Sequence, residues 1–318
     1  MQSPPFISYA QNGEDVVLWR ALQHVGLGTY VEVGANHPSD DSATRAFYDR
    51  GWSGVTVEPV PAFAALQRRD RPRDTLVEAA ISTVEGDVTL HLIPESGLST
   101  LVDTVSEEHE RRGISHEDVV VPAVRLEALL DDAGLAGKDI HFLLIDVEGA
   151  EADVLASVDL TVWRPWVLVV ESTAPNSTEQ THDAWQDGVL AAGYEFCLFD
   201  GVSRFYVAAE RASELRAALS YPACVLDRYV TRTVDRLVGD RGSALADAVH
   251  WRTLALTAWA DAVAASTPRE EPVPDAGLQA EAEHLRAQIT ALQHTVSWRV
   301  TRPLRGVRRV AAHLRPAR

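Results

Sequence analysis

Acidic side chains follow several apolar segments of this sequence, at positions where they could bind a ligand or move a proton. Glu32 lies in the apolar run from Tyr30 to Asn36, which ends in a glycine turn. Glu58 closes the next run, and Asp146 and Glu171 close two later ones. Such runs, separated by helical stretches, are typical of a parallel sheet, whose ligands bind beyond the carboxyl ends of the strands. We therefore expect these four carboxylates along one edge of an α/β sheet.

The glycine turn favours a nucleoside ligand that carries positive charge. Gly34 lets backbone approach a ligand closely, and Ala35 and Asn36 complete the turn. The G-x-G-x-x-G dinucleotide fingerprint is absent, and Glu32 would repel a pyrophosphate. Glu58 lies where nucleoside-binding sheets carry an acid for the ribose hydroxyls. S-adenosylmethionine has this chemistry, whereas the alternative is an ordinary turn glycine and a solvated strand end.

A second group of candidate residues begins at Asp146, the last residue of an apolar strand. Glu148 follows it by two positions, and Gly149 allows a sharp turn. One carboxylate could position a bound nucleoside while the other acts on a second substrate, since taking a proton from a hydroxyl needs a general base, worth roughly 10²–10⁴ in rate, or a metal. His37, directly after the glycine turn, is a further candidate base. The alternatives are that Asp146 caps a helix and that His37 is a surface residue.

The sequence does not establish a metal site. The histidines show no metal-ligand spacing such as H-x-x-x-H. A divalent ion would have to be held by acids, Asp146 and Glu171 first, which favours magnesium. The two cysteines, Cys197 and Cys224, suggest neither a disulfide framework nor a metal knuckle.

Five segments carry a family resemblance: Tyr9–Asp15, Val31–Pro38, Phe47–Gly54, Val57–Pro59 and Ile145–Glu151. Through them, and above all through the last, IDVEGAE, the sequence resembles the FkbM-type methyltransferases, a branch of the S-adenosylmethionine-dependent Rossmann-like enzymes. The segments span roughly the first two-thirds of the chain. The resemblance implies a Rossmann-like class I methyltransferase fold with a mostly parallel sheet, to which the chain adds a C-terminal helical extension.

The segment before the first strand is expected to lie across the donor pocket. The resemblance implies that Gln11 and Asp15 face this site. The residues also fit a helix start, with Asn12 as the cap and Glu14 and Asp15 in the first turn, and the two interpretations are compatible.

Composition excludes several classes of function. The chain has 318 residues, 46% of them hydrophobic, and a net charge of −17. An acidic body of this kind argues against nucleic acid as a partner, because binding a phosphate backbone relies on Lys and Arg. No signal peptide or long apolar span is evident, so a cytoplasmic protein is expected.

The pattern along the chain predicts five parts. These are a methyltransferase domain (1–210), a helical extension (211–265), a Pro-rich linker (266–277), a short coiled-coil segment (278–296) and a basic amphipathic tail (297–318). The region between Asp87 and Arg125 reads as an insertion, either a flap over the acceptor or a solvated surface excursion. The segment 278–296 either forms a homodimer or packs back on the body.

The tail has two interpretations. It holds seven arginines and no acidic residue, with Trp, Val and Leu between them. This favours peripheral contact with an anionic membrane at its inner face, whereas the alternative is a basic tail that pairs with the acidic body. Its S-W-R-x-T-x-P-L-R motif resembles the terminus of many bacterial glycan-assembly proteins.

Together, the family and tail resemblances imply an S-adenosylmethionine-dependent O-methyltransferase. Its acceptor would be a hydroxyl of a bacterial saccharide, polysaccharide or glycolipid. The rival hypothesis is a catalytically inactive, methyltransferase-like scaffold in a glycan-assembly complex.

Overall fold

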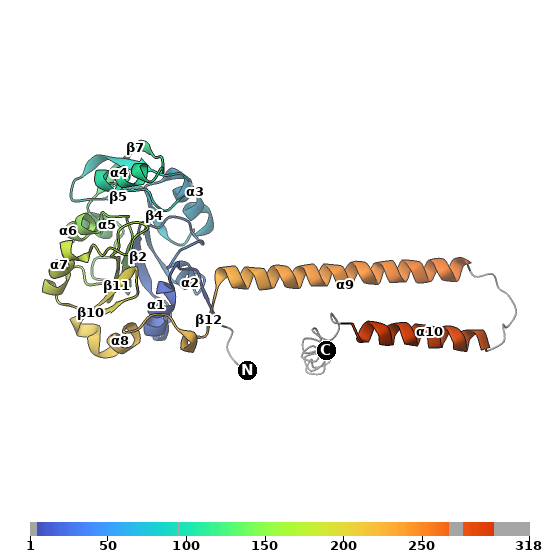
Figure 1. Cartoon of the computed structure of the whole chain (residues 1–318). Helices are drawn as coiled ribbons and strands as arrows, with labels where there is room; N and C mark the ends of the chain where they lie inside the picture. Colours follow the sequence, from blue (N-terminus) through green and yellow to red (C-terminus); the bar gives the residue numbers. More distant parts are fainter. Residues whose placement is uncertain (1–4, 95, 267–275, 296–318) are drawn as a thin grey trace. The chain divides into compact units, whose positions relative to one another are not determined.

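A seven-stranded sheet forms the centre of the larger of two compact units in the computed structural model, which describes residues 5–94, 96–266 and 276–295 (Figure 1). Its strand order is β10-β11-β9-β8-β2-β3-β4. The strands are β2 (Thr29–Val33), β3 (Ser53–Val57), β4 (Thr75–Val77), β8 (Phe142–Ile145), β9 (Val167–Glu171), β10 (Tyr194–Phe199) and β11 (Ser203–Ala208). Five are parallel, while β11 is antiparallel to both of its neighbours. The mostly parallel α/β sheet expected from the sequence is confirmed.

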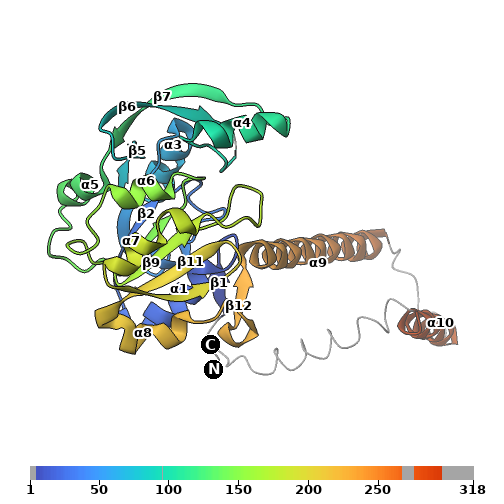
Figure 2. The same cartoon turned by 60° about the vertical axis from the view of Figure 1, so that its left-hand side comes forward.

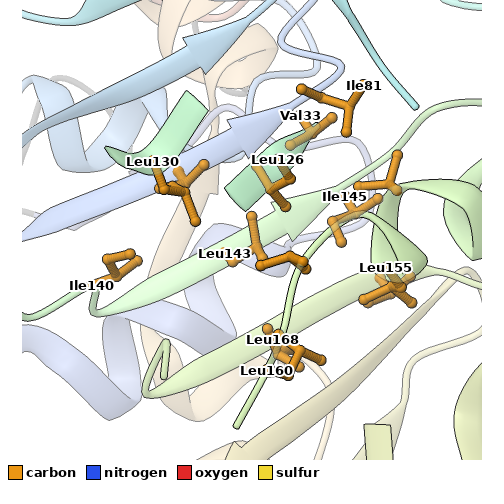
Figure 3. Close-up of a cluster of buried hydrophobic side chains, with 14 of the residues drawn as sticks. Val33, Ile81, Leu126, Leu130, Ile140, Leu143, Ile145, Leu155, Leu160 and Leu168 are labelled. Carbon is orange, nitrogen blue, oxygen red and sulfur yellow. The ribbon is translucent and has the colours of Figure 1, made fainter. Parts of the chain in front are cut away.

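Two apolar layers cover the faces of this sheet. Successive residues of a strand point to opposite faces, so Leu143 and Ile145 belong to one buried cluster and Phe142 and Leu144 to the other. The first cluster packs against α5 (Leu126–Asp132), α6 (Glu151–Ala156) and α7 (Gln186–Ala191), as Figure 3 shows in part. The second packs against α1 (Glu14–Leu22), α2 (Arg45–Tyr48) and α8 (Ala212–Leu219). Burial on both faces explains why the central strands are continuous apolar runs.

The order of the strands reverses between β2 and β8. From β2 the chain proceeds outward to β3 and β4, and it then returns to β8 and β9 on the other side. The helix α3 (Pro61–Asp70) connects β3 to β4. Open parallel sheets bind ligands at the carboxyl ends of the strands that flank such a reversal. The topology therefore selects the ends of β2 and β8 as the place for a site.

A separate three-stranded sheet accounts for the predicted insertion. It consists of β5 (Ala80–Ile81), β7 (Glu117–Val124) and β6 (Gly86–Leu92), in that order, with α4 (Asp103–Arg111) in the connection from β6 to β7. Figure 2 shows these elements together at one end of the body. A small cluster of buried side chains, including Leu90 and Val121, forms their own core. The insertion is thus a folded subdomain of the body rather than a solvated surface excursion.

The body continues beyond residue 210, where the sequence placed its boundary. In α8, Leu215 and Leu219 are fully buried in the core. Further along, β12 (Tyr229–Thr231) pairs in parallel with β1 (Phe6–Ser8), two short strands that the sequence analysis did not identify. The first compact unit extends to Gly242.

Two helices make up the described part of the C-terminal region. They are α9 (Arg232–Ser266) and α10 (Ala276–Gln293), which fit the predicted helical extension and coiled-coil segment. Short 3-10 turns occupy Gln23–Val25, His182–Ala184, Ala209–Arg211 and Val225–Asp227. Of the described helices, none has the length and apolar character that crossing a membrane requires. Most of the predicted linker, and the whole basic tail from 297 to 318, lie outside the described residues.

Candidate active site

A cavity of about 540 Å³ opens at the reversal of the sheet. Its walls come from the ends of β2, β3 and β8 and from the insertion, which contributes Ser96, Gly97, Leu98, Ser99 and Leu101. This volume lies in the range of small-molecule sites. The segment of the insertion therefore covers part of the cavity, as the flap interpretation predicts.

Gly34 brings the ends of β2 and β8 into close contact. Its φ is +85°, and a Cβ atom added to it would lie 1.7 Å from the backbone oxygen of Asp146. The neighbouring backbone is fixed by bonds from the N–H groups of Gly34 and Ala35 to the carbonyl of Val57, at 3.1 and 3.0 Å. Glycine is thus required here both by conformation and by space, and Gly34, Ala35 and Asn36 all line the cavity.

Glu58 holds this turn in place and also lines the cavity. One carboxylate oxygen accepts a bond from the Asn36 N–H at 2.6 Å, and the other accepts one from the Val60 N–H at 2.7 Å. Burial raises the pKa of Glu58 to about 7, against the effect of these two bonds. Each oxygen keeps a further lone pair, so the side chain can still accept bonds from a ribose.

Glu32 also lines the cavity, but a buried network engages it. Its Oε2 accepts bonds from Thr44 at 2.6 Å and from Arg71 at 3.5 Å. The guanidinium of Arg71, whose side chain is fully buried, also bonds Tyr30 and Asp74. Burial raises the pKa of Glu32 to about 7, and Arg71 opposes the shift. Glu32 therefore anchors the end of β2, a role that its sequence pattern did not indicate.

Three carboxyl groups gather at the ends of β8 and β9. Asp146, Glu148 and Glu171 each offer an oxygen within 4.8 Å of the others. Neither Oε2 of Glu148 nor Oε2 of Glu171 has a hydrogen-bond partner within the described ranges. Asp146 is exposed and lines the cavity, while Glu171 is half-buried and is not part of the cavity lining. The expected convergence of Asp146 and Glu171 is present, and Glu148 joins them.

These three groups cannot all ionise together. Burial raises the pKa of each, and repulsion between them adds to the effect for Glu148, whose pKa is about 8, and for Glu171. A hydrogen bond between Glu171 and Asp146 lowers the pKa of Asp146 and raises that of Glu171. Of the two, Glu171 therefore holds a proton more firmly than Asp146 does.

The loop after Asp146 is shaped for this arrangement. Glu148 has a φ of +51° and Gly149 a φ of +102°, so the predicted sharp turn is present. A left-handed conformation at a residue other than glycine is characteristic of functional sites. Glu151 steadies the loop by accepting bonds from the Val147 and Gly149 N–H groups. The alternative that Asp146 caps α6 is wrong, because Ala150 occupies that position without a side-chain cap.

His37 lies in the cavity wall, but its geometry does not suit a general base. Its Nδ1 accepts bonds from the backbone N–H groups of Ser39 and Asp40, at 3.3 and 3.0 Å. The neutral ring then carries its proton on Nε2 and can only donate from there. His37 is better placed to donate a hydrogen bond to a ligand than to remove a proton from one.

The two residues that we expected to face the donor from the segment before α1 differ in position. Gln11 lines the cavity. Asp15 does not: it is fully buried, and its carboxylate accepts bonds from the Ser8 hydroxyl at 2.7 Å and the Tyr9 N–H at 2.7 Å. The expectation that Asp15 contacts the donor is therefore corrected. Asp15 fixes the turn that carries Gln11, and Gly13 rather than Asn12 stands at the start of the helix.

Gln67 is a site residue that the sequence analysis missed. From α3 its amide nitrogen donates to the carbonyls of Ala35 and Asn36, at 3.1 and 2.9 Å, and the side chain is buried. It thus clamps the glycine turn from outside the cavity. Nothing in its sequence neighbourhood signals this role, because its partners lie some thirty residues earlier in the chain.

Comparison with known proteins gives a family match over the region that contains this cavity. The "Methyltransferase FkbM domain" family matches residues 32–196, just over half of the chain. No curated protein matches it. Among solved structures, an O-methyltransferase from Bacillus cereus in complex with SAH is similar at 13% identity and a TM-score of 0.34, covering 61% of this chain and 78% of that one.

A second similar structure is the 1,6-didemethyltoxoflavin-N1-methyltransferase of Burkholderia thailandensis with bound 1,6-didemethyltoxoflavin and S-adenosylhomocysteine. It shares 13% identity at a TM-score of 0.32, over 62% of this chain and 77% of that one. Similarity at this level assigns neither a substrate nor a reaction to the present chain.

Proposed function

The chain belongs to the FkbM methyltransferase family, and on this basis we propose that it transfers a methyl group from S-adenosylmethionine to a hydroxyl of a saccharide, polysaccharide or glycolipid. The observation that carries the proposal is the cavity at the reversal of the sheet. It combines a glycine turn with the carboxyl groups of Glu58, Asp146 and Glu148. The glycine turn and these three carboxyl groups all fall within residues 32–196, which the family match covers.

The donor half of the cavity is formed by the ends of β2 and β3. S-adenosylmethionine supplies an activated methyl group on a positively charged sulfur. Glu58 would accept bonds from its ribose, and the backbone of Ala35 and Asn36 would lie against the nucleoside. Asp146, at the adjacent end of β8, would attract the positive charge through its carboxyl group. A site lined by acids in this way favours a cationic donor over one that carries phosphates.

The acceptor half is formed by the Asp146 loop and the insertion. Ser96 and Ser99 line it from the insertion, and Asn176 from the loop after β9. Hydroxyl and amide groups of this kind bond sugar hydroxyls. Because the acceptor proton must leave as the bond to the methyl carbon forms, we assign Asp146 and Glu148 as the groups that orient the hydroxyl and take its proton.

The three clustered carboxyl groups also bear on magnesium. Carboxylate oxygens are the ligands that this ion prefers, and bound magnesium would acidify the acceptor hydroxyl. Magnesium binding stays a prediction, and dialysis against a chelator followed by readdition of the ion would test it through turnover.

Calorimetry and product analysis test the main proposal. The full chain should bind S-adenosylmethionine and should release S-adenosylhomocysteine when a bacterial glycan acceptor is added. Glu148→Gln should lower turnover by about 10²–10⁴ while donor binding is kept, and Asp146→Asn should lower turnover by a similar factor and also weaken donor binding. Full turnover in both variants would contradict the site assignment. Donor binding without product, over a broad set of glycans, would instead favour the scaffold hypothesis.

Peripheral membrane contact through 297–318 belongs to this proposal as a prediction about a segment outside the described residues. Sedimentation with anionic liposomes should bring down the full chain and leave a chain ending at Ser266 in the supernatant. Equal partitioning of the two would contradict it.

A further inference from the structure

The insertion contains a second cluster of chemistry-bearing side chains, away from the cavity walls. It consists of His91 on β6, His116 before β7, and Asp118 on β7. Each offers one donor atom, and the three atoms lie within 4.8 Å of one another. His91 and His116 are mostly buried, with side chains 11% and 15% exposed, while Asp118 faces solvent. We propose that these three residues form a binding site for a transition-metal ion, of which zinc best fits the donor set.

The distances support tetrahedral coordination. Metal–ligand bonds of about 2.0–2.1 Å at tetrahedral angles place ligand atoms about 3.3 Å apart. The Asp118 Oδ1 is 3.4 Å from the His116 Nε2 and 2.7 Å from the His91 Nδ1. One of these two pairs already has the required separation, and the other must lengthen by about half an ångström as the ion replaces a proton. In the third pair, the two histidine nitrogens lie within 4.8 Å of each other. The fourth position would be left to water.

Outer partners contact both imidazoles. The His91 Nε2 lies 3.0 Å from Asp103, and the Ser106 hydroxyl lies 3.1 Å from the His116 Nδ1 and 3.3 Å from its Nε2. With the proton of His91 on Nε2, its Nδ1 faces Asp118 as a metal ligand would, and a bound ion would replace the Ser106 contact at the His116 Nε2. Metal-binding histidines commonly bond a carboxylate or another acceptor through the second ring nitrogen in this way.

A nearby buried histidine is a further sign of an incomplete site. His109 on α4 is 1% exposed, and neither of its ring nitrogens has a partner in the part of the chain that the structure describes. Its pKa is lowered by burial, and by the nearby Arg112 and His116. Buried polar groups without partners are rare and call for an ion, a water or a rearrangement.

The proposed metal would fix the wall of the catalytic cavity. The backbone groups of His91 and Thr100 exchange two hydrogen bonds, at 2.9 and 3.2 Å. The Thr100 hydroxyl in turn donates to the carbonyl of Glu148 at 2.8 Å. An ion that ties His91 to His116 would therefore hold the segment from Ser96 to Leu101 against the Asp146 loop.

The competing explanation is an ion pair without metal. Burial alone would lower the pKa of His91, but its bonds to Asp103 and Asp118 raise it above the ordinary value. A protonated His91 between two carboxylates would satisfy the same contacts. His116→Gln separates the two explanations, because it removes a metal ligand and leaves both partners of His91 in place.

Metal titration of the full chain tests the proposal. After treatment with a chelator, the full chain should bind zinc at about pH 8, above the ordinary pKa of histidine. Excess magnesium should be present during the titration, so that it occupies the carboxyl cluster of Asp146, Glu148 and Glu171. Cobalt in place of zinc should give the visible absorption of a tetrahedral site. His116→Gln should weaken zinc binding by more than about 10-fold, the cost of losing even an outer partner. The control His24→Gln changes an exposed histidine bonded to Glu214 and should bind as the unaltered chain does.

Hydrogen exchange provides the second readout. Zinc should slow exchange between residues 96 and 102 in the unaltered chain but not in His116→Gln. Equal zinc affinity in the two proteins, or no zinc binding at all, would overturn the proposal and leave the ion pair. Neither result depends on methyl transfer, so failure here is distinct from failure of the proposed function.

Discussion

Glu148 combines a strained backbone with a carboxyl group that resists ionisation. Its φ of +51°, and an Oε2 that has no partner among the described residues, are tolerated because the surrounding loop is held by Glu151 and Thr100. A carboxyl group whose pKa is near 8 can exchange a proton close to neutral pH, which is what acid–base work requires. The strain and the shifted pKa thus mark the same residue.

The raised pKa of Glu148 has a consequence for stability. The folded state holds this proton above pH 4.5, where the unfolded state loses it, so the contribution is full at low pH and is lost as pH rises through about 8. We expect the free energy of unfolding to fall by ~1–3 kcal/mol between pH 5 and pH 8, and Glu148→Gln to reduce this fall. Urea denaturation at several pH values measures it. An unchanged pH dependence in the variant would contradict the assignment.

Gly34 allows a comparison of crowding with backbone strain. Gly34→Ala should cost about 3 kcal/mol or more and abolish donor binding, because the new methyl group would meet the backbone of Asp146. Gly137→Ala is the matched control, since Gly137 also has a positive φ but has open space around it. The control should lose about 1–2 kcal/mol, the cost of the left-handed conformation alone. Similar losses of stability in the two variants would show that close packing at Gly34 is not important.

The sequence predicted the residues that follow strands and missed those that act across the fold. Gly34, Glu58 and Asp146 could be found because each ends an apolar run, and parallel strands bring such ends to one edge. Arg71 and Gln67 lie on or after a polar helix and reach partners far away in sequence, so no local pattern distinguishes them. The error with Asp15 arose because the family segment marks a buried structural bond as readily as a ligand contact.

At the scale of elements, α3 supports the donor site through Gln67, a residue that does not itself line the cavity. Gln67→Leu would leave the Ala35 and Asn36 carbonyls without their partner, at a cost of about 1–3 kcal/mol. We expect the Kd for S-adenosylmethionine to rise by about 10-fold, which corresponds to 1.4 kcal/mol. Turnover at saturating donor should stay near that of the unaltered chain. The control Gln23→Leu changes an exposed glutamine outside the cavity, and equal affinities in the two variants would contradict the clamp.

The insertion was predictable, whereas its side-chain cluster was not. The sequence placed an insertion between Asp87 and Arg125, but the register that sets His91 opposite Asp118 is a property of the folded antiparallel pair. With His91 and His116 far apart in sequence, no ligand spacing could appear. Which residues face each other across two strands therefore cannot be predicted from the order of residues along the chain.

At the scale of the whole molecule, α9 exposes a longer apolar face than α10 does, and a second copy of the chain could cover it. Every residue from Arg236 to Trp259 is exposed in the single chain. Val238, Leu245 and Trp259 share one position of a seven-residue repeat, and Val249 and Leu256 share a second position four residues later. Such a seam is typical of a coiled coil. Pairing with a second copy would bury it, and α10, with exposed Leu285 and Ile289, could add the homodimer contact that was one of the two alternatives for 278–296.

Light scattering tests this association. The full chain should be a dimer, and Leu256→Asp should make it monomeric because the new charge would lie in the apolar seam. Leu254→Asp is the control, since Leu254 is also exposed but faces the opposite side of the helix. A monomeric unaltered chain, or dissociation by both substitutions alike, would contradict the dimer.

The pairing of β1 with β12 affects the order in which parts of the body can fold during synthesis. Phe6 leaves the ribosome early, yet its partner Tyr229 emerges only after the rest of the body has been synthesised. The turn that presents Gln11 follows directly from β1, so the support that it gains from β12 forms only after residue 231 has been synthesised. A chain that ended before that residue would retain the bonds of Asp15 in this turn but lack the strand that holds β1 beside it.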